Sequence, residues 1–75
     1  MSNKFFVVLG ERYQELRESK HLSRQQVADH FNVTRQAIFL WETGERKVNG
    51  DMMIQLFDYY GVDVNEEVRK LRKYL

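Results

Sequence analysis

Arg35 and Gln36 are adjacent side chains whose hydrogen-bonding groups match the edges of nucleic-acid bases. A glutamine amide pairs with adenine through two hydrogen bonds, and an arginine guanidinium pairs with guanine in the same way. Both residues begin a predicted helix, and an α-helix fits the major groove of DNA, where those edges are exposed. The pair therefore predicts base contacts. Two alternatives stay open: Arg35 neutralises only a phosphate, and Gln36 is merely a solvated polar residue.

The charge balance requires that any phosphate contacts come from a few cations on one face. The 75-residue chain has 12 basic and 11 acidic residues and a formal net charge of only +1. Free backbone N–H groups at a helix start attract phosphate, and basic loops flank the groove. The predicted phosphate contacts are Arg24, Gln25, Thr34, Arg46 and Lys47. Because Glu45 adjoins the last two, a solvated charge cluster is the alternative for that pair.

The predicted helix over 34–43 has an inner and an outer side. If Ile38 points to the core, steps of about 100° per residue bring Trp41 and Glu42 to the same side. The side chains then expected to face outward, and to read bases together with Arg35, are Gln36, Phe39, Leu40 and Thr43.

Phe39 and Leu40 are neighbouring apolar side chains on this outer side, where polar residues are expected. Leu40 can contact the methyl group of a thymine. Alternatively, the two side chains form a patch that binds another protein. The third interpretation is packing of Phe39 against Arg35 or the edge of the first helix.

Other kinds of chemistry find little support in the composition. The chain has no cysteine and no glycine-rich phosphate loop, and its two histidines, His21 and His30, fall at the ends of different predicted helices. We therefore expect neither an enzyme nor a metal or cofactor site. The longest apolar run, Phe5 to Leu9, is too short to span a membrane, and the lack of cysteine suits a cytoplasmic protein.

Capping residues divide the chain into helices, because a Ser, Thr, Asp or Asn side chain can accept a hydrogen bond from one of the free backbone N–H groups at the start of a helix. Ser23 with Gln26 forms a capping box, supported by a hydrophobic staple of Leu22 and Val27. Further helix starts are predicted at Thr34, Asn49 and Asp63. Helix ends are predicted near Asn32, Gly44 and Gly61, where a left-handed residue can close a helix.

These signals predict an all-α fold with one domain over residues 1–75, a compact bundle of five helices. The predicted helices span about 5–20, 23–31, 34–43, 50–60 and 64–75. The second and third are separated by only two residues, which favours a steep crossing rather than a packed hairpin. The region from Ser23 to Gly44 is therefore predicted to be a helix-turn-helix.

From Leu9 to about Val64 the sequence resembles the lambda-repressor-like domains of phage repressors, Cro proteins and bacterial regulators. The residues that carry this resemblance are Leu9, Gly10, Arg12, Leu16, Arg17, Leu22, Ser23, Val27, Ala28, the string Val33 to Ile38, Trp41, Glu42, Gly44, Leu56, Gly61 and Val62. The resemblance implies a five-helix domain that binds double-stranded DNA as a homodimer, on a two-fold operator read by the third helix. It also implies a buried ion pair of Arg17 and Glu42. Asn32 replaces the glycine usual at the turn.

Apolar residues at both ends exceed what one helix face can bury. They are Phe5, Phe6, Val7 and Val8 in the first predicted helix, and Val68, Leu71, Tyr74 and Leu75 in the last. One interpretation is that these residues form a dimer seam, the interface between two copies of the chain. Completion of the monomer core is the alternative.

The sequence thus predicts a transcription regulator, a repressor of Cro/C1 type from a phage or a bacterium. The alternative is an antirepressor or modulator that binds another regulator through Phe39 and Leu40. The chain is also compatible with being the amino-terminal part of a longer regulator.

Overall fold

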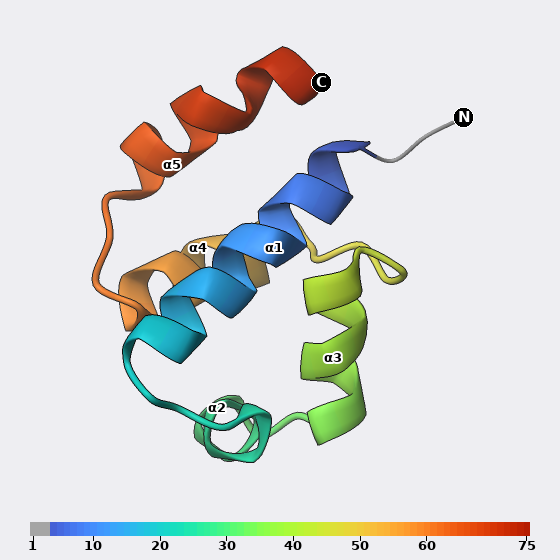
Figure 1. The fold of residues 1–75 in the computed structure, drawn as a ribbon, viewed down its shortest axis with the longest axis vertical. Helices are drawn as coiled ribbons and strands as arrows, with labels where there is room; N and C mark the ends of the chain where they lie inside the picture. Colours follow the sequence, from blue (N-terminus) through green and yellow to red (C-terminus); the bar gives the residue numbers. More distant parts are fainter. Residues whose placement is uncertain (1–3) are drawn as a thin grey trace.

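The computed structural model describes residues 4–75, and the regular structure of this part is entirely helical (Figure 1). Its elements are α1 Lys4–Ser19, α2 Arg24–Phe31, α3 Arg35–Thr43, α4 Gly50–Tyr59, α5 Val64–Leu71 and a 3₁₀ turn, η1, Arg72–Tyr74. The predicted all-α, five-helix class is confirmed.

The capping side chains predicted from the sequence begin the helices as expected. The Ser23 hydroxyl accepts from the backbone N–H of Gln26, while the Gln26 side chain accepts from the N–H of Ser23, which completes the capping box. Thr34, Asn49 and Asp63 likewise accept from backbone N–H groups of the helices that follow them. The four helices α2 to α5 therefore each start one residue after a cap.

The last helix is shorter than the predicted range 64–75. α5 ends at Leu71, and the chain continues as the 3₁₀ turn, in which the N–H of Leu75 bonds to the carbonyl of Arg72. A 3₁₀ turn advances about 120° per residue, because it has three residues per turn, so its residues do not continue the face of the preceding α-helix. Leu75 is consequently 83% exposed, and the predicted end of this helix at residue 75 is wrong.

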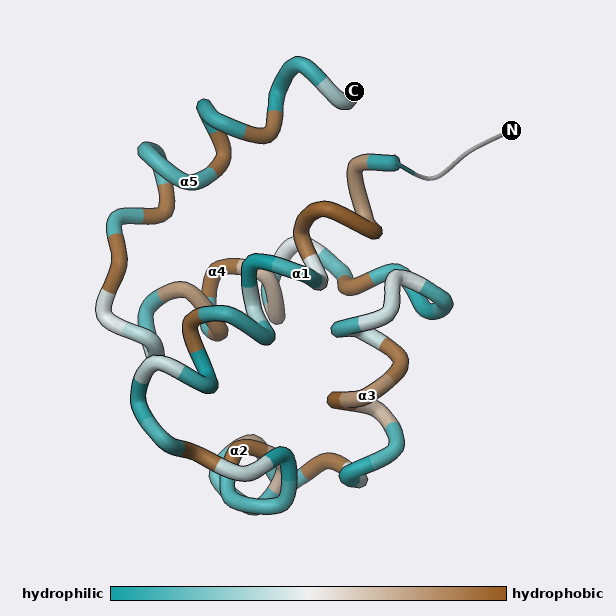
Figure 2. The backbone as a smooth tube through the Cα atoms, viewed as in Figure 1, coloured by the Kyte–Doolittle hydropathy of each residue, from teal (hydrophilic) through white to brown (hydrophobic). Residues whose placement is uncertain are grey.

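α1 runs through the middle of the molecule, with α3 on one side and α5 on the other (Figure 1). The core gathers around its buried side chains Leu9, Tyr13 and Leu16. Figure 2 shows the apolar stretches of the surrounding helices. The other core members are Val27, Ala28, Ile38, Val48, Leu56, Phe57, Tyr60 and Leu71.

Most of the apolar residues expected at a dimer seam pack inside this monomer. Those that are buried in the core or lie against it are Phe5, Phe6, Val8, Leu71 and Tyr74. The structure therefore favours the alternative, completion of the monomer core, for these five side chains.

Two glycines bring α1 against the end of α3. A Cβ atom on Gly10 would overlap the carbonyl oxygens of Trp41 and Glu42, so the backbones of α1 and α3 touch there. Gly44 ends α3 with a φ of 82°, and a Cβ on it would lie 2.8 Å from the Cα of Val7. Only glycine fits both positions, since the nearest neighbouring atom at each belongs to the backbone.

α5 is held to α1 by an ion pair that the sequence analysis did not predict. The guanidinium of Arg12 donates to both carboxylate oxygens of Glu67, over 2.8 and 3.0 Å. Glu67 is 5% exposed, and its hydrogen bonds with Arg12 lower the pKa of its carboxyl from the ordinary value. The carboxylate of Glu67 is therefore fully compensated, and it fixes where α5 lies on α1.

His21 has a left-handed backbone, with a φ of 58°, immediately after α1. The N–H of Leu22 reaches back to the carbonyl of Arg17, which closes α1 through this conformation. A residue with a Cβ atom is strained there by roughly 1 to 2 kcal/mol.

Replacement of His21 by glycine is expected to stabilise the domain by about 0.5 to 1 kcal/mol, because the removed strain exceeds the entropy that glycine adds to the unfolded chain. Urea unfolding followed by circular dichroism measures the gain. Asn32→Gly is the matched control: Asn32 has a φ of 56°, but asparagine tolerates this region, so its gain should be smaller. A loss of stability in His21→Gly would contradict the strain.

Candidate nucleic-acid interface

The turn between α2 and α3 sets the two helices at a steep crossing. Asn32 adopts the left-handed conformation, and the N–H of Val33 bonds to the carbonyl of Ala28. Val27 and Ala28 are fully buried against Ile38, which is 1% exposed. The crossing places α3 at the edge of the molecule, beside α2 (Figure 1).

α3 presents its first residues outward, as the helical spacing predicts. Ala37, Ile38 and Glu42 are buried, and the exposed residues include Arg35, Gln36 and Phe39. Leu40 and Thr43 are only half-buried, so the predicted outward side is narrower than expected. The apolar surface of this face is formed mainly by Phe39, at 38% exposure.

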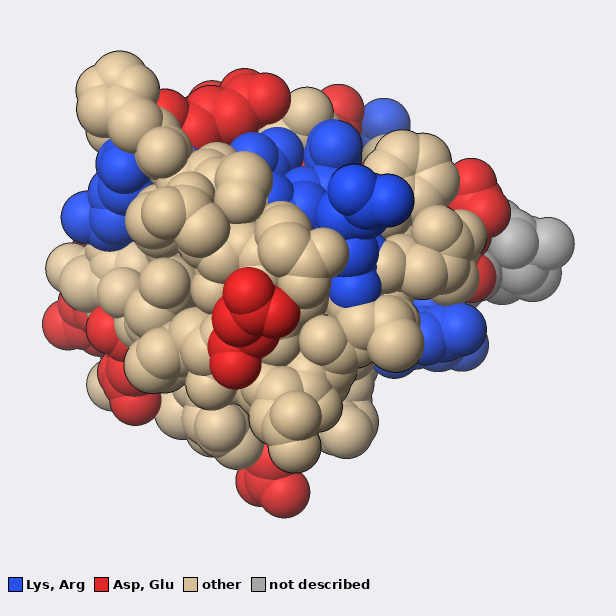
Figure 3. All heavy atoms as spheres, turned by 90° about the horizontal axis from the view of Figure 1, so that it is seen from below, with Lys and Arg blue, Asp and Glu red and all other residues tan. Residues whose placement is uncertain are grey.

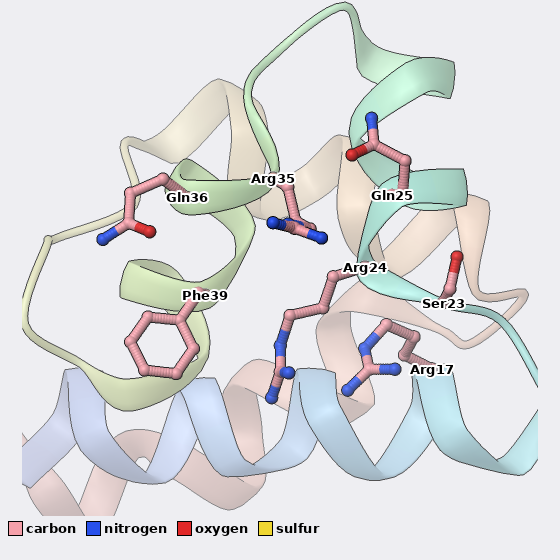
Figure 4. A pocket seen from close by; sticks show the side chains of 7 residues that line it. All are labelled: Arg17, Ser23, Arg24, Gln25, Arg35, Gln36 and Phe39. Atoms are coloured by element: carbon pink, nitrogen blue, oxygen red, sulfur yellow. The ribbon is translucent and has the colours of Figure 1, made fainter.

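An open hollow of about 530 Å³ lies between the first turns of α2 and α3 (Figure 4). Its lining residues are Arg17, Ser23, Arg24, Gln25, Arg35, Gln36 and Phe39. Six of these seven are polar or charged, and three are arginines. The residues predicted for base and phosphate contact at the starts of the two helices therefore meet in one place.

One buried carboxylate organises the base of this hollow. Glu42 is 4% exposed and accepts from Nε and Nη2 of Arg17 over 2.7 and 3.2 Å, which confirms the predicted ion pair. Arg17 also donates to the carbonyl of Leu22, and its hydrogen bonds with Glu42 raise the pKa of the guanidinium. Nε of Arg24 donates to the same carboxylate over 2.9 Å. Two guanidinium groups thus share one carboxylate.

Arg24 also stacks on Phe39. The Cζ atom of its guanidinium lies 5.3 Å from the centre of the ring, within the range of a cation–π contact. The predicted packing of Phe39 is therefore against Arg24 rather than Arg35. Figure 4 shows the Arg24 side chain between Phe39 and Arg17. Arg24 is held from two sides, so its guanidinium occupies a fixed place in the hollow.

Three other predicted contact residues have local partners. The Gln25 amide donates to Asp29 over 2.8 Å, and the Thr34 hydroxyl caps Ala37. The Thr43 hydroxyl donates to the carbonyl of Leu40. These hydrogen bonds give each side chain a structural role within its own helix.

The loop pair Arg46 and Lys47 is exposed beyond the end of α3. The ammonium of Lys47 lies 5.6 Å from the ring of Phe6 in α1. Seen from below, on the side where α2 lies, the surface carries a cluster of basic atoms, with an acidic side chain beside it near the centre of the view and the other acidic atoms toward the edges (Figure 3). The local positive charge is thus much greater than the net charge of the chain indicates.

The bond between Arg24 and Glu42 is the part of the site that the sequence analysis missed. Arg24 was assigned to a phosphate from its place at a helix start, which does not reveal a partner 18 residues away. The sequence contains a usable signal. Glu42 is the single carboxylate expected inside α3, and one arginine precedes the Leu22–Ser23 turn, Arg17, while another follows it, Arg24.

Within residues 4–75, no helix is both long enough and apolar enough to cross a membrane. Nor do three or more His, Asp or Glu side chains converge in this part of the chain as metal ligands would.

Comparison with known proteins identifies the family. Residues 14–66 match the helix-turn-helix family. The chain is 32% identical over 57 residues to the HTH-type transcriptional activator BcrR of Enterococcus faecalis, an alignment that covers 76% of this chain and 28% of that protein. The chain thus spans less than a third of that relative's length, and no solved structure gives a significant match. Because the family match covers most of the chain and includes both α2 and α3, the chain belongs to the helix-turn-helix family.

Proposed function

We propose that this chain is a sequence-specific, DNA-binding transcription regulator whose α3 enters the major groove. The observation that carries the proposal is the hollow between α2 and α3, where the outward side chains of Arg35 and Gln36 adjoin two further arginines. In helix-turn-helix docking, the first residues of the second helix approach the base edges. Family membership and the relative named as a transcriptional activator support the same general role.

Within this proposal, Gln36 and Arg35 read bases and Phe39 adds an apolar contact. Arg24, Gln25 and Thr34 lie toward the phosphates at the starts of the helices, while Arg46 and Lys47 flank the groove. Phosphate contacts of this kind fix the orientation of the domain, and base contacts give the sequence preference.

The finer form of the proposal is a phage or bacterial repressor of Cro/C1 type in the cytoplasm, bound as a homodimer to a two-fold operator. Two-fold symmetry in the protein is matched by symmetry in the half-sites. Since most of the apolar residues expected at the seam pack inside the monomer, the dimer would use the remaining exposed surface.

The second candidate is an antirepressor that binds another regulator through Phe39 and Leu40. The 38% exposure of Phe39 favours it. Against it, Arg24 covers one side of the Phe39 ring and Leu40 is half-buried, which leaves a small apolar patch.

Selection of bound sequences from a random double-stranded DNA library tests the proposal. We expect a recovered motif, and we expect binding to that motif to weaken steeply as salt rises, because several cations replace counterions on the phosphates. Recovery of no motif, or binding that is indifferent to salt, would favour the antirepressor. Symmetry in the motif decides between a two-fold operator and a single half-site.

Gln36→Ala is expected to weaken binding to the selected motif by about 1 to 3 kcal/mol, because one bidentate base contact is lost, and to relax the preference at one base pair. Fluorescence anisotropy with the motif and its single-base variants measures both effects. Gln55→Ala, at an exposed position of α4, is the control and should leave DNA binding unchanged. Unchanged affinity and base preference in Gln36→Ala would exclude Gln36 as a reader.

A further inference from the structure

A second hollow, of about 320 Å³, lies between α1 and the segment formed by α5 and η1. It shares no lining residue with the hollow between α2 and α3, so the proposed DNA contacts leave it free. Its apolar lining consists of Val8, Leu71 and Tyr74. We call it the basic groove, for the charged residues around this lining.

The charged residues of the basic groove are Arg12, Glu67, Lys70 and Lys73. Arg12 already compensates the single carboxylate through two hydrogen bonds. The Lys70 side chain is 65% exposed, and its ammonium is 3.9 Å from Glu67, at the limit of an ion pair. Lys73 is exposed as well. The Lys73 ammonium lies 5.3 Å from the centre of the Tyr74 ring. The lining thus has three cations and one carboxylate around apolar side chains, and this excess of positive charge suits an apolar side chain flanked by carboxylates.

The outer face of α4 carries that combination. Ile54 is 46% exposed, and Phe39 and Leu75 are the other exposed large hydrophobic residues in the described part of the chain. Asp51 and Asp58 are exposed three residues before Ile54 and four residues after it, and this spacing places all three on one side of a helix. Within residues 4–75 neither carboxylate forms an ion pair. We call this surface the acidic face.

The helix start explains only part of the acidic face. Asp51 lies in the first turn of α4, where a carboxylate stabilises the helix through its dipole. Asp58 lies near the other end, where the same effect is unfavourable, and Ile54 gains nothing from exposure to water. A partner that contacts both Asp58 and Ile54 makes their position on this exposed face favourable.

We propose that a second copy of this chain is that partner, with the acidic face of one copy docked in the basic groove of the next. Ile54 then covers the apolar lining, while Asp51 and Asp58 approach Lys70 and Lys73. Asp51 and Asp58 are about 10 Å apart along α4, because each residue rises about 1.5 Å, so their carboxylates lie on either side of Ile54. Both lysines belong to the α5–η1 wall of the groove, three residues apart, and their long side chains can reach toward the two carboxylates.

The two surfaces differ, so the contact is head-to-tail and leaves one groove and one acidic face unused in each pair. Further copies can therefore add at either end. If the proposed DNA binding holds, this contact links copies on neighbouring sites, whereas two-fold pairing joins the halves of one operator. Self-association itself does not depend on DNA, so the two proposals are tested separately.

Sedimentation velocity of the whole chain, up to about 1 mM because small interfaces are weak, tests the contact. The parent is expected to associate as its concentration rises, and less so in high salt. The variants K70E/K73E and D51K/D58K should each associate at least about tenfold more weakly, because like charges then meet. I54A should weaken association without changing any charge. Circular dichroism verifies that these exposed substitutions leave the fold intact.

An equimolar mixture of K70E/K73E and D51K/D58K is the decisive sample. The acidic groove of the first variant fits the basic α4 face of the second, and the unchanged faces of the two variants also fit each other. We therefore expect the mixture to associate although each variant alone does not. R46E/K47E, which changes the loop after α3, is the matched control and should associate like the parent.

Four results would overturn the proposal. The first is that the parent stays monomeric at all concentrations, and the second is that K70E/K73E still associates like the parent, which points to another self-contact. The third is that the mixture stays monomeric. The fourth is that K70E/K73E loses DNA affinity with no change in association, which makes the groove a phosphate contact. If the parent stays monomeric but binds an acidic, leucine-containing test peptide in the groove, the occupant is another protein rather than a second copy.

Discussion

Glu42→Gln is expected to destabilise the domain by about 3 to 5 kcal/mol, the range found when one partner of a buried ion pair is removed. Arg17 is 6% exposed and would keep its charge with only the exposed Glu18, 3.9 Å away, as a carboxylate partner. A domain of this size has a total stability of only a few kcal/mol, so much of the variant should be unfolded at room temperature. Thermal unfolding followed by circular dichroism measures the loss.

An exposed ion pair supplies the control for this substitution. Glu66 pairs with Arg69 on α5, and both side chains are more than half exposed, so Glu66→Gln should cost less than about 1 kcal/mol. The double variant R17M/E42L should recover much of the stability lost in Glu42→Gln, because a buried pair can be replaced by apolar side chains of similar size. Equal unfolding temperatures for Glu42→Gln and the parent would show that the pair contributes nothing.

The double variant also separates the two roles of Glu42. In R17M/E42L the fold is largely restored, but Arg24 has lost the carboxylate that holds its guanidinium over Phe39. We expect DNA affinity to stay below that of the parent. Loss of binding on substitution of Glu42 therefore reflects both the fold and the position of Arg24.

Gly10→Ala is expected to destabilise the domain by at least about 2 kcal/mol, since the added methyl group overlaps two carbonyl oxygens of α3. The better helix propensity of alanine, about 1 kcal/mol, offsets only part of the cost. Unfolding should occur roughly 10 °C lower, as expected for a domain of this size. α3 must also shift away from α1, so DNA affinity should fall on the order of tenfold, the equivalent of one base contact.

Gly50→Ala is the matched control, because it makes the same change at the first residue of α4, where a Cβ atom meets nothing within 4 Å. It should leave both stability and DNA affinity close to those of the parent. If Gly10→Ala behaves in the same way, then α1 and α3 can separate without loss, and their close crossing does not position α3 for DNA binding.

Local chemistry accounts for what the sequence predicted well. The starts of α2, α3, α4 and α5 depend on a cap and its neighbours within a few residues, and all four caps form the expected hydrogen bonds. The inner side of α3 follows from helical spacing alone. The Arg17–Glu42 pair came from family resemblance, since no short-range pattern connects residues 25 positions apart.

The features that sequence reasoning missed depend on how distant elements meet. Arg12 and Glu67 are 55 positions apart in the sequence. Each is indistinguishable from an ordinary surface charge in the sequence, because their pairing depends on the packing of α5 against α1. The left-handed backbone of His21 was not predicted, because histidine adopts this conformation far less readily than glycine does, so its presence alone does not mark a helix end. Arg24 was assigned from the helix start alone, although its partner lies on another helix.

The division of α3 into a buried and an exposed side has an evolutionary consequence. Gln36 is exposed, so descendants of this chain can exchange it at little cost in stability, and under the proposed function this exchange changes the operator preference. Arg24 lacks this freedom, because its bond to Glu42 ties it to the ion pair that holds α1 and α3 together. New binding specificities should therefore arise first at Gln36 and only rarely at Arg24.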